Sequence, residues 1–387
     1  MLLAAAVVFC AGAETPSYLR GYETEYARSP RRAAQEWFRQ AKFGMFVHYA
    51  LASLLERGKP GLIERAGSDE VMELIGENPE RLEKLSASNP AARKALRIKR
   101  ELFNQFDARN FDAGRICDLV REAGMRYVTF TTKHLGGLYM YRTTVTKFTS
   151  VNSPAHRDLV AELAAACRKR GLGLFLYVPP EVARTDKEHL ERNRTVLREL
   201  LTQYGPIAGI WFDGIGPYHR NPENYTRLAE TYAFVRSLQP QCLISFKDGA
   251  IGEEDFRTPE HFLLPAPYEW ESKLRQQRWE VRLQRWKKTY GDERWKLFRK
   301  MAAEINTTMQ ECHNRDGVGE PGGWINDEQA RHLGPDEVME LLIYARTVRA
   351  NLLLNVGPRG DGSLHPADVR TLREVGRRLR VNGFPGE

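Results

Sequence analysis

The stretch Asp158-Leu-Val-Ala-Glu-Leu-Ala-Ala-Ala-Cys-Arg-Lys-Arg170, followed by Leu172-Gly-Leu-Phe-Leu-Tyr-Val178, decides the fold. Its first part has apolar residues at three- and four-residue spacing, which is typical of an amphipathic helix. Its second part is apolar on both faces, as expected for a strand that helices cover on one side and a packed interior on the other. Repeated units of this kind predict a parallel sheet.

The same alternation runs through the chain. Further β-rich runs lie at 43–49, 127–132, 207–212, 242–246, 305–309 and 352–356, and further amphipathic helices are expected over 112–123, 190–204, 225–238 and 335–349. Seven units with room for an eighth favour an α/β fold of the (β/α)8 TIM-barrel type. An open doubly wound sheet is less favoured, because no GxGxxG follows the first run. Two charged stretches, 54–106 and 268–301, break the rhythm and are expected to be helical insertions at loops.

Composition and charge exclude several classes of protein. The chain has 387 residues, 42% of them hydrophobic, and a net charge of +8, so disorder, collagen and coiled coil are ruled out. Lysines and arginines are scattered over helix-like segments that also carry acids, which argues against a nucleic-acid partner. No apolar run is long enough for an integral membrane segment. Without CxxC, HExxH or P-loop spacing, we expect no metal and no cofactor.

Residues 1–13 have the apolar centre and small-residue end of a signal peptide, with cleavage expected before Glu14. The alternative is a buried helix or strand at the N-terminus. A signal peptide would make the protein secreted or periplasmic, with residues 14–387 as a single catalytic domain. Cys117 and Cys167 fall within helical patterns, where a thiol is usually a small core residue.

Polar residues stand at the C-terminal ends of several of the expected strands. This is the end of a barrel at which the active site lies. One such residue alone usually marks a solvated strand end, but six strand ends of this kind in one chain indicate a site. The combination of histidine, lysine, aromatic rings and carboxylates is typical of carbohydrate chemistry. The residues at these ends are His48, Lys133, His134, Tyr177, Glu181, Trp211, Asp213, Lys247, Asp248 and Asn355.

The motifs around these residues resemble those of glycoside hydrolase family 29, the α-L-fucosidases, in family order over about residues 35–385. They are Lys42-Phe-Gly-Met-Phe-Val-His48, Thr132-Lys-His134, Arg157-Asp-Leu-Val160, Leu176-Tyr177, Trp211-Phe-Asp-Gly214, Asp255-Phe-Arg-Thr-Pro-Glu260 and Asn351-Leu-Leu-Leu-Asn-Val-Gly-Pro358. The resemblance implies a (β/α)8-like catalytic barrel and a retaining exo-glycosidase.

The resemblance also assigns roles to residues. It makes Asp213 the nucleophile and Glu260 the acid/base, with Glu181 and Glu304 as rival acids. The substrate-binding positions that it implies are His48, Lys133, His134, Tyr177, Trp211 and Lys247, the last standing where the family usually has an arginine.

The chain departs from the family at one motif in particular. The usual K-H-H-D-G-F is replaced by Lys133-His-Leu-Gly-Gly-Leu138, and we expect no C-terminal β-sandwich after the barrel. Losing a hydrogen-bond partner for a sugar hydroxyl changes substrate choice strongly. Three alternatives therefore stay open: a glycosidase for a different sugar, a glycan-binding barrel without catalysis, and a polyanion binder that rests only on the positive charge. The oligomeric state is not predicted.

Overall fold

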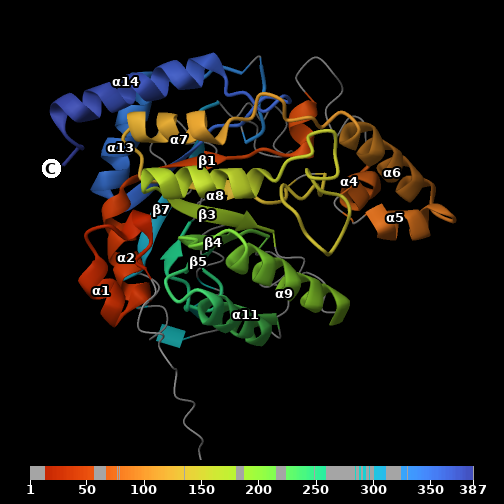
Figure 1. Ribbon diagram of the computed structural model, residues 1–387, viewed down its shortest axis with the longest axis horizontal. Helices are drawn as coiled ribbons and strands as arrows, with labels where there is room; N and C mark the ends of the chain where they lie inside the picture. The colour runs from red at the N-terminus through yellow and green to blue at the C-terminus, as the bar shows by residue number, and fades with distance from the viewer. Residues whose placement is uncertain are drawn as a thin grey trace, which may run out of the picture.

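Eight parallel strands form a closed barrel in the order of the sequence (Figure 1). They are β1 (Phe43–Val47), β2 (Tyr127–Thr131), β3 (Gly173–Val178), β4 (Gly209–Phe212), β5 (Leu243–Phe246), β6 (Phe256–Arg257), β7 (Ala302–Thr308) and β8 (Ala350–Asn355). The predicted TIM-barrel fold is confirmed. This computed structural model describes residues 14–55, 67–75, 77, 79–134, 136–179, 187–214, 224–247, 249–258, 300–310, 324–328 and 330–386, and positions 284, 287, 288, 291, 292 and 296.

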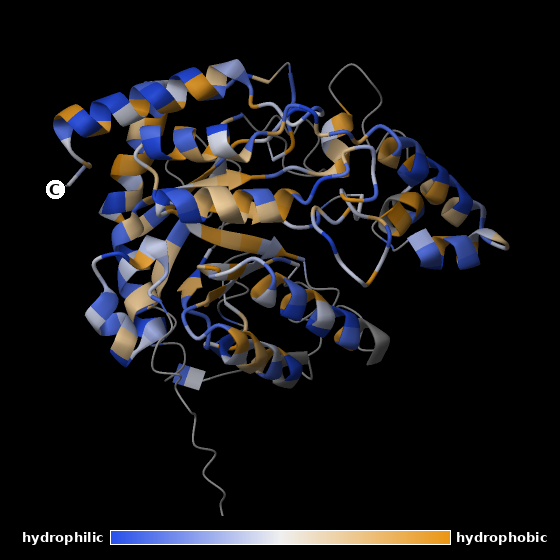
Figure 2. Cartoon of the chain, viewed as in Figure 1, coloured by the Kyte–Doolittle hydropathy of each residue, from blue (hydrophilic) through white to orange (hydrophobic). Residues whose placement is uncertain are grey.

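Helices follow the strands and cover the outside of the barrel. They are α7 (Ala113–Glu122), α8 (Leu159–Arg170), α9 (Lys187–Thr202), α11 (Asn224–Leu238), α13 (Pro335–Thr347) and α14 (Pro366–Asn382). Asp158 caps α8 by accepting a hydrogen bond from the Ala161 N–H at 2.9 Å, and Gly171 ends it in the left-handed conformation. The strands are strongly apolar and the helices are apolar along one stripe (Figure 2). This pattern explains why the strand and helix periods could be distinguished in the sequence.

The amino end of the barrel is closed by a helix that precedes the first strand. After η1 (Ser17–Leu19) and α1 (Glu23–Arg28), α2 (Pro30–Ala41) brings Trp37 and Phe38 against the barrel interior. The Phe38 ring centre lies 4.2 Å from that of Phe256 and 5.8 Å from that of Tyr127. Polar groups that carry chemistry therefore gather at the opposite, carboxyl end of the strands.

The described part of the first predicted insertion, 54–106, is largely helical and lies to one side of the barrel (Figure 1). It follows η2 (Leu51–Leu54) and contains α4 (Asp69–Ile75), α5 (Pro79–Ser86) and α6 (Pro90–Phe103). Lys99 of α6 is fully buried and donates hydrogen bonds to the carbonyls of Ile75, Glu77 and Gly136 at 2.8, 2.9 and 2.6 Å. Since Gly136 belongs to the turn after β2, Lys99 joins the insertion to the carboxyl end of the barrel.

Other sequence expectations have mixed outcomes. The second insertion, 268–301, lies largely outside the described residues, as does the signal-peptide stretch 1–13. Cys117 and Cys167 are buried as expected, with their sulfur atoms 3.6 Å apart as free thiols. No helix in the described part of the chain is both long and apolar enough to cross a membrane.

Candidate active site

Asp213 follows β4, and both of its carboxylate oxygens are held by neighbours. The Tyr177 hydroxyl donates a hydrogen bond to Oδ2 at 2.6 Å, and the Lys247 ammonium lies 2.9 Å from Oδ1. The backbone N–H of Gly214 donates to Oδ1 at 2.5 Å. These donors come from β3, from the end of β5 and from Gly214 next to Asp213. Closing the barrel therefore assembles this carboxylate site.

The surroundings of Asp213 keep it ionised. Burial alone would raise its pKa, because a buried carboxylate loses solvation. The positive charge of Lys247 and the hydrogen bonds from Tyr177, Lys247 and Gly214 outweigh that effect and lower the pKa to about 2. At neutral pH the carboxylate is therefore charged, and its neighbours hold it in one orientation. This is the state that a nucleophile needs.

Lys247 adopts a backbone conformation that is rare for a residue with a side chain. Its φ is +46°, and its carbonyl accepts a hydrogen bond from the Thr258 N–H at 2.5 Å. The ammonium lies 5.2 Å from the centre of the Trp211 ring, within the range of a cation–π contact. Strained residues of this kind are common at functional sites. Lys247 thus contacts both the carboxylate and the ring beside it.

His48 ends β1 and is held in one tautomer. Its Nδ1 lies 2.7 Å from Asn355 Oδ1, which also accepts the backbone N–H of His48 at 3.3 Å. Asn355 Nδ2 donates to the Trp324 carbonyl at 3.0 Å, which fixes the orientation of the amide. The Nδ1 of His48 therefore carries the proton and Nε2 is the acceptor. Burial, followed by the nearby His134, lowers the pKa of His48 well below its usual value, so the ring is neutral.

His134 lies beside His48 with the two rings in an edge-to-face arrangement, 5.1 Å apart. Burial lowers the pKa of His134 to about 4. Its Nδ1 is buried and has no hydrogen-bond partner among the described residues. A buried polar atom in this state costs free energy, which a ligand hydroxyl would recover. The two histidines are thus neutral groups suited to an uncharged, hydroxyl-rich ligand.

Aromatic rings form the wall of the site. Tyr177 and Trp211 are stacked with ring centres 5.6 Å apart and an angle of 24°. Trp324 packs 4.8 Å from His48. The sequence did not single out Trp324, because the segment around it has no period and its approach to β1 is non-local. Asn355 could be found as a strand end, but not as the residue that sets the His48 tautomer.

The structure gives fewer contacts for the remaining predicted site residues, or does not describe them. The backbone of Lys133 forms an isolated antiparallel β-bridge with that of Tyr139, and the Lys133 ammonium lies 5.0 Å from the centre of the Tyr139 ring. Glu260 and Glu181 lie outside the described residues, as does Asp248. Glu304 projects from β7 into the barrel interior and accepts hydrogen bonds from Tyr127 and Trp211. Its position favours a role inside the barrel over proton donation at the mouth.

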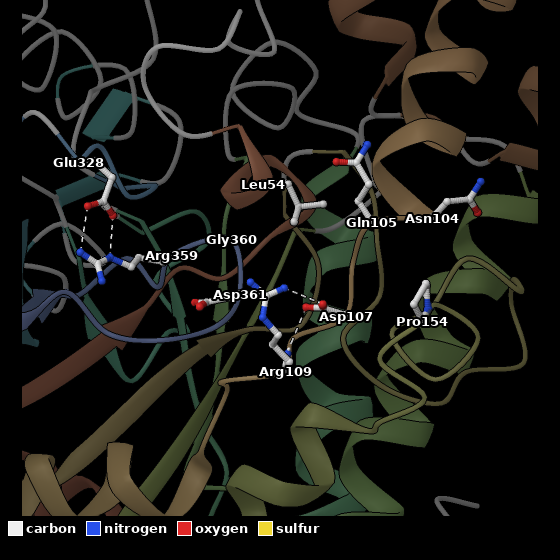
Figure 3. Close-up of a pocket in the computed structure, with 10 residues that line it drawn as sticks. All are labelled: Leu54, Asn104, Gln105, Asp107, Arg109, Pro154, Glu328, Arg359, Gly360 and Asp361. Atoms are coloured by element: carbon white, nitrogen blue, oxygen red, sulfur yellow. Dashed lines mark hydrogen bonds and ion pairs between the residues drawn. The ribbon is translucent and has the colours of Figure 1, made fainter.

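A cavity of about 680 Å³, whose lining does not include Asp213, lies at the same end of the barrel (Figure 3). Its lining includes Leu54 after β1, and Arg359 and Asp361 after β8. The charged groups there pair with one another: Arg359 lies 2.7 Å from Glu328, and Arg109 lies 2.8 Å from Asp107. These two ion pairs hold four of the charged groups in the lining, and the remaining one, Asp361, accepts hydrogen bonds from Asn110 and Ser363. We place the candidate active site at Asp213, where a carboxylate lies beside the histidines and aromatic rings.

A closed barrel with an ionised carboxylate, two neutral histidines and stacked aromatic rings at its carboxyl end is the kind of site that a glycoside hydrolase uses. The family model for α-L-fucosidase matches residues 10–296 and 284–384. The chain therefore belongs to the α-L-fucosidase family, as its motifs predicted, and it is an enzyme that acts on glycans.

Characterised relatives cover most of the chain. Tissue α-L-fucosidase of Rattus norvegicus is 26% identical over 401 residues, which span 99% of this chain and 75% of that protein. α-L-Fucosidase 1 of Arabidopsis thaliana is also 26% identical, over 70% of this chain and 51% of that protein.

Solved structures share the fold. α-L-Fucosidase AlfC from Lactobacillus casei, in complex with its α-L-fucose product, superposes with a TM-score of 0.61 at 22% identity. It covers 90% of this chain and 98% of its own length. Isoenzyme 1 from Paenibacillus thiaminolyticus gives a TM-score of 0.62 at 23% identity, over 92% of this chain and 77% of its own.

Proposed function

We propose that the protein is a retaining exo-glycosidase that hydrolyses terminal α-L-fucosidic bonds, with Asp213 as the nucleophile and Glu260 as the acid/base. The observation that carries this proposal is the Asp213 carboxylate, which is held by Tyr177 and Lys247 with a pKa of about 2. Family membership supports the substrate.

Asp213 would attack the anomeric carbon of the sugar and form an ester as the bond to the departing oxygen breaks. The ester itself is neutral, because the negative charge passes to Glu260 when this residue gives its proton to the departing oxygen. Lys247 and Tyr177 remain in place to stabilise the Asp213 carboxylate when it is regenerated. The neutral rings of His48 and His134 would bind sugar hydroxyls, through Nε2 of His48 and the unpaired Nδ1 of His134. Trp211 and Tyr177 supply the apolar wall.

Glu260 would transfer protons on the other side of the bond. It would first protonate the departing oxygen and then take a proton from the water that cleaves the ester. Two displacements at the same carbon return the sugar with its original configuration. The retaining mechanism requires carboxyl groups about 5–5.5 Å apart.

Replacing the nucleophile tests this assignment. Asp213→Gly removes the attacking carboxylate and leaves space for a small anion, so turnover of an aryl α-L-fucoside should fall by several orders of magnitude. Added azide should restore part of the rate and give a glycosyl azide of inverted configuration, identified by NMR. If folded Asp213→Gly turns over the substrate at the parent rate, Asp213 is not the nucleophile.

Glu260→Ala is the matched control for chemical rescue. This variant should still form the ester from a substrate with a good leaving group, but it should hydrolyse the ester slowly. Azide should then yield a product of retained configuration. The two variants thus give azides of opposite stereochemistry, and the same stereochemistry from both would contradict the division of roles.

A glycosidase for a related sugar is a second candidate, favoured by the altered motif over 133–138. His134 is followed there by Leu135 and two glycines, so the second histidine and the aspartate of the usual motif are missing. A panel of aryl fucosides and galactosides separates the candidates. Preference for a sugar other than fucose would support the second, and binding of a glycan without turnover of any substrate would indicate a barrel that has lost catalysis.

We further propose that residues 1–13 are a signal peptide and that the protein is secreted or periplasmic, with residues 14–387 forming one catalytic domain. The apolar run and its Ala-Gly-Ala end support this. N-terminal sequencing of the protein recovered from the source cells should begin at Glu14. A retained Met1 would overturn the proposal.

A further inference from the structure

We propose that Glu304, a buried carboxyl group inside the barrel, is a positioning residue for the reaction that acts through Trp211 on the two groups that hold Asp213. This inference rests on the proposed function, since it takes Asp213 as the nucleophile. It also concerns a residue that touches neither the sugar nor the attacking oxygen.

Glu304 is fixed from two sides near the start of β7. It is only 1% exposed, and its Oε2 accepts a hydrogen bond from the Tyr127 hydroxyl at 2.5 Å. The Tyr127 ring has little room to move, because a Cβ atom added to Gly44 would lie 2.4 Å from it. The other oxygen, Oε1, accepts the indole N–H of Trp211 at 3.1 Å. The carboxyl group therefore fixes the indole N–H end of Trp211, whose ring also packs 5.4 Å from that of Phe46.

Trp211 transmits this position to the site. One neighbour of its ring is Tyr177, stacked at 5.6 Å, and another is the Lys247 ammonium at 5.2 Å. These are the two side chains that hold the Asp213 oxygens, at 2.6 and 2.9 Å. A shift of the indole would thus move both partners of the carboxylate. Small displacements of this kind are costly in catalysis, because attack requires a narrow range of geometry.

The charge on Glu304 sets the strength of this support. Burial raises the pKa of Glu304 to about 7, against the lowering effect of the hydrogen bonds from Tyr127 and Trp211. An ionised carboxylate is a stronger acceptor for the indole N–H than a protonated carboxyl group. Its negative charge also favours the electron-poor transition state of glycoside cleavage. Activity should therefore rise as the pH passes through about 7 and Glu304 ionises.

Four other titratable groups around this interior, Asp213, His134, His48 and Tyr127, have pKa values shifted away from 7. The pKa of Asp213 is about 2 and that of His134 about 4, and the pKa of His48 is well below its usual value. Burial, together with the charge of Glu304 and its hydrogen bond, raises the pKa of Tyr127 far above neutrality. Of the titratable groups around Glu304, Tyr127 on β2 contacts it directly. The others lie nearer the carboxyl ends of the strands: Tyr177 on β3, Asp213 after β4, Lys247 after β5, His48 after β1 and His134 after β2.

A layer of polar side chains lies in the interior next to Glu304. Thr129 and Asn306 follow Tyr127 and Glu304 by two residues and so lie on the same face of their strands. Ser245 is in register with Trp211 on the neighbouring strand. The side-chain polar atoms of these three residues are buried without a hydrogen-bond partner among the described residues. Such a layer is suited to water that carries a proton between Glu304 and the mouth.

The pH dependence of kcat/KM tests the proposal. The parent enzyme should show a rising limb near pH 7, and Glu304→Gln, which keeps the shape and an acceptor oxygen, should lose that limb. We expect kcat of Glu304→Gln to be about tenfold lower above pH 7, because a neutral acceptor is roughly half as strong as a charged one. The control is Glu199→Gln, another buried glutamate, which accepts the hydroxyls of Thr143 and Thr144 at 2.6 Å on the outside of the barrel. It should lose stability and keep the parent pH profile.

A double-mutant cycle tests the route through Trp211. Trp211→Phe removes the indole N–H and keeps an aromatic ring, so adding Glu304→Gln to it should change kcat by much less than Glu304→Gln does alone. Additive losses would show that Glu304 acts by another route, and a pH profile of Glu304→Gln identical to the parent profile would overturn the proposal.

A third variant covers the case in which Glu304→Gln does not fold. Tyr127→Phe removes a hydrogen bond that lowers the pKa of Glu304, so the rising limb should move to higher pH. An unmoved limb contradicts the assignment.

The fluorescence of Trp211, taken as the difference between the parent and Trp211→Phe, should show the same transition without substrate. This measurement stands even if Asp213→Gly proves active, so failure of the proposed function and failure of this inference can be told apart.

Discussion

At the scale of single residues, the site depends on how opposite charges are balanced. Asp213 stays ionised because Lys247 and Tyr177 compensate for its burial. His48 and His134 stay neutral because burial lowers their pKa values by more than the nearby charge of Asp213 raises them. One pocket thus holds a charged nucleophile beside uncharged rings that can bind hydroxyl groups.

Removing the compensating groups should move the acid limb of activity. In Lys247→Met the pKa of Asp213 should rise, because the nearest positive charge is lost and the burial remains. We expect the limb of kcat/KM that Asp213 sets, which lies at much lower pH than the rise near pH 7 that Glu304 sets, to shift upward by about one pH unit or more. We also expect kcat to fall about 100-fold, as for the loss of a charged contact at a transition state. Tyr177→Phe should shift the limb in the same direction by less, since it removes one neutral donor. A limb that stays in place in both variants would contradict the pKa assignment.

Stability should also depend on pH through His134. Its pKa is about 4 in the folded protein, against about 6.5 for an unperturbed histidine. The unfolded chain therefore binds more protons between these values, and stability should fall as the pH drops from about 6.5 to about 4. The loss is at most about 3 kcal/mol, from roughly 1.4 kcal/mol per pKa unit.

His134→Gln should flatten this part of the profile. Glu304 acts in the opposite sense, because its folded pKa of about 7 is raised. The stabilisation that the buried Glu304 carboxyl group adds to the folded state is present below about pH 4.5 and is lost as the pH rises through about 7. Urea unfolding across the pH range, with Glu304→Gln as the second variant, separates the two slopes. Equal slopes for the parent and both variants would show that neither group titrates as described.

At the scale of elements, the insertion after β1 is part of the site's support. Lys99 on α6 holds Gly136, which follows His134 by two residues. The glycine is also close to η2, where an added Cβ would lie 2.9 Å from the Cβ of Leu51. The altered motif over 133–138 therefore packs between the insertion and the segment after β1.

Lys99→Met should uncouple this turn. It keeps an unbranched apolar chain and leaves the carbonyls of Ile75, Glu77 and Gly136 without their donor, at a cost of roughly 3 kcal/mol or more. We expect a lower melting temperature and a higher KM with a smaller change in kcat, because His134 is placed in the substrate-binding part of the site. Arg97→Met, at an exposed position of the same helix, is the control. A destabilised Lys99→Met with the parent KM would show that the insertion supports the fold only.

The elements also show what could be predicted from the sequence. Strands such as β3 could be found because both of their faces are apolar, and the polar residues that end them, such as Asp213 and Lys247, could be found from the same runs. β6 could not, because the two residues of Phe256–Arg257 show no period. The contacts of Trp324 and the partners of Glu304 join distant parts of the chain, and no local pattern encodes them.

At the scale of the whole molecule, closure of the barrel joins residues far apart in the sequence. The Asn351 side chain accepts the Lys42 N–H at 3.0 Å and donates to the Phe38 carbonyl at 2.8 Å, so it links β8 to the segment between α2 and β1. Asn351→Ala should destabilise the protein by about 2–3 kcal/mol, since it leaves buried backbone groups unpaired. Asn152→Ala, which removes an exposed loop hydrogen bond, should have little effect. Urea denaturation of both variants measures the difference, and equal midpoints would show that Asn351 does not secure the closure.

The seam between β1 and β8 has a further consequence during synthesis. Lys42 and Asn351 are 309 residues apart, so at about 5–20 residues per second β1 waits roughly 15–60 s on the ribosome for its last neighbour. Throughout that time one edge of β1 is unpaired and open to other chains. Because every strand pair of the barrel joins segments that are not adjacent in the sequence, and the last pair joins its two ends, the barrel should fold slowly for its size. Yield in cells should therefore depend on chaperones that cover the nascent edge more than on the stability of the finished enzyme.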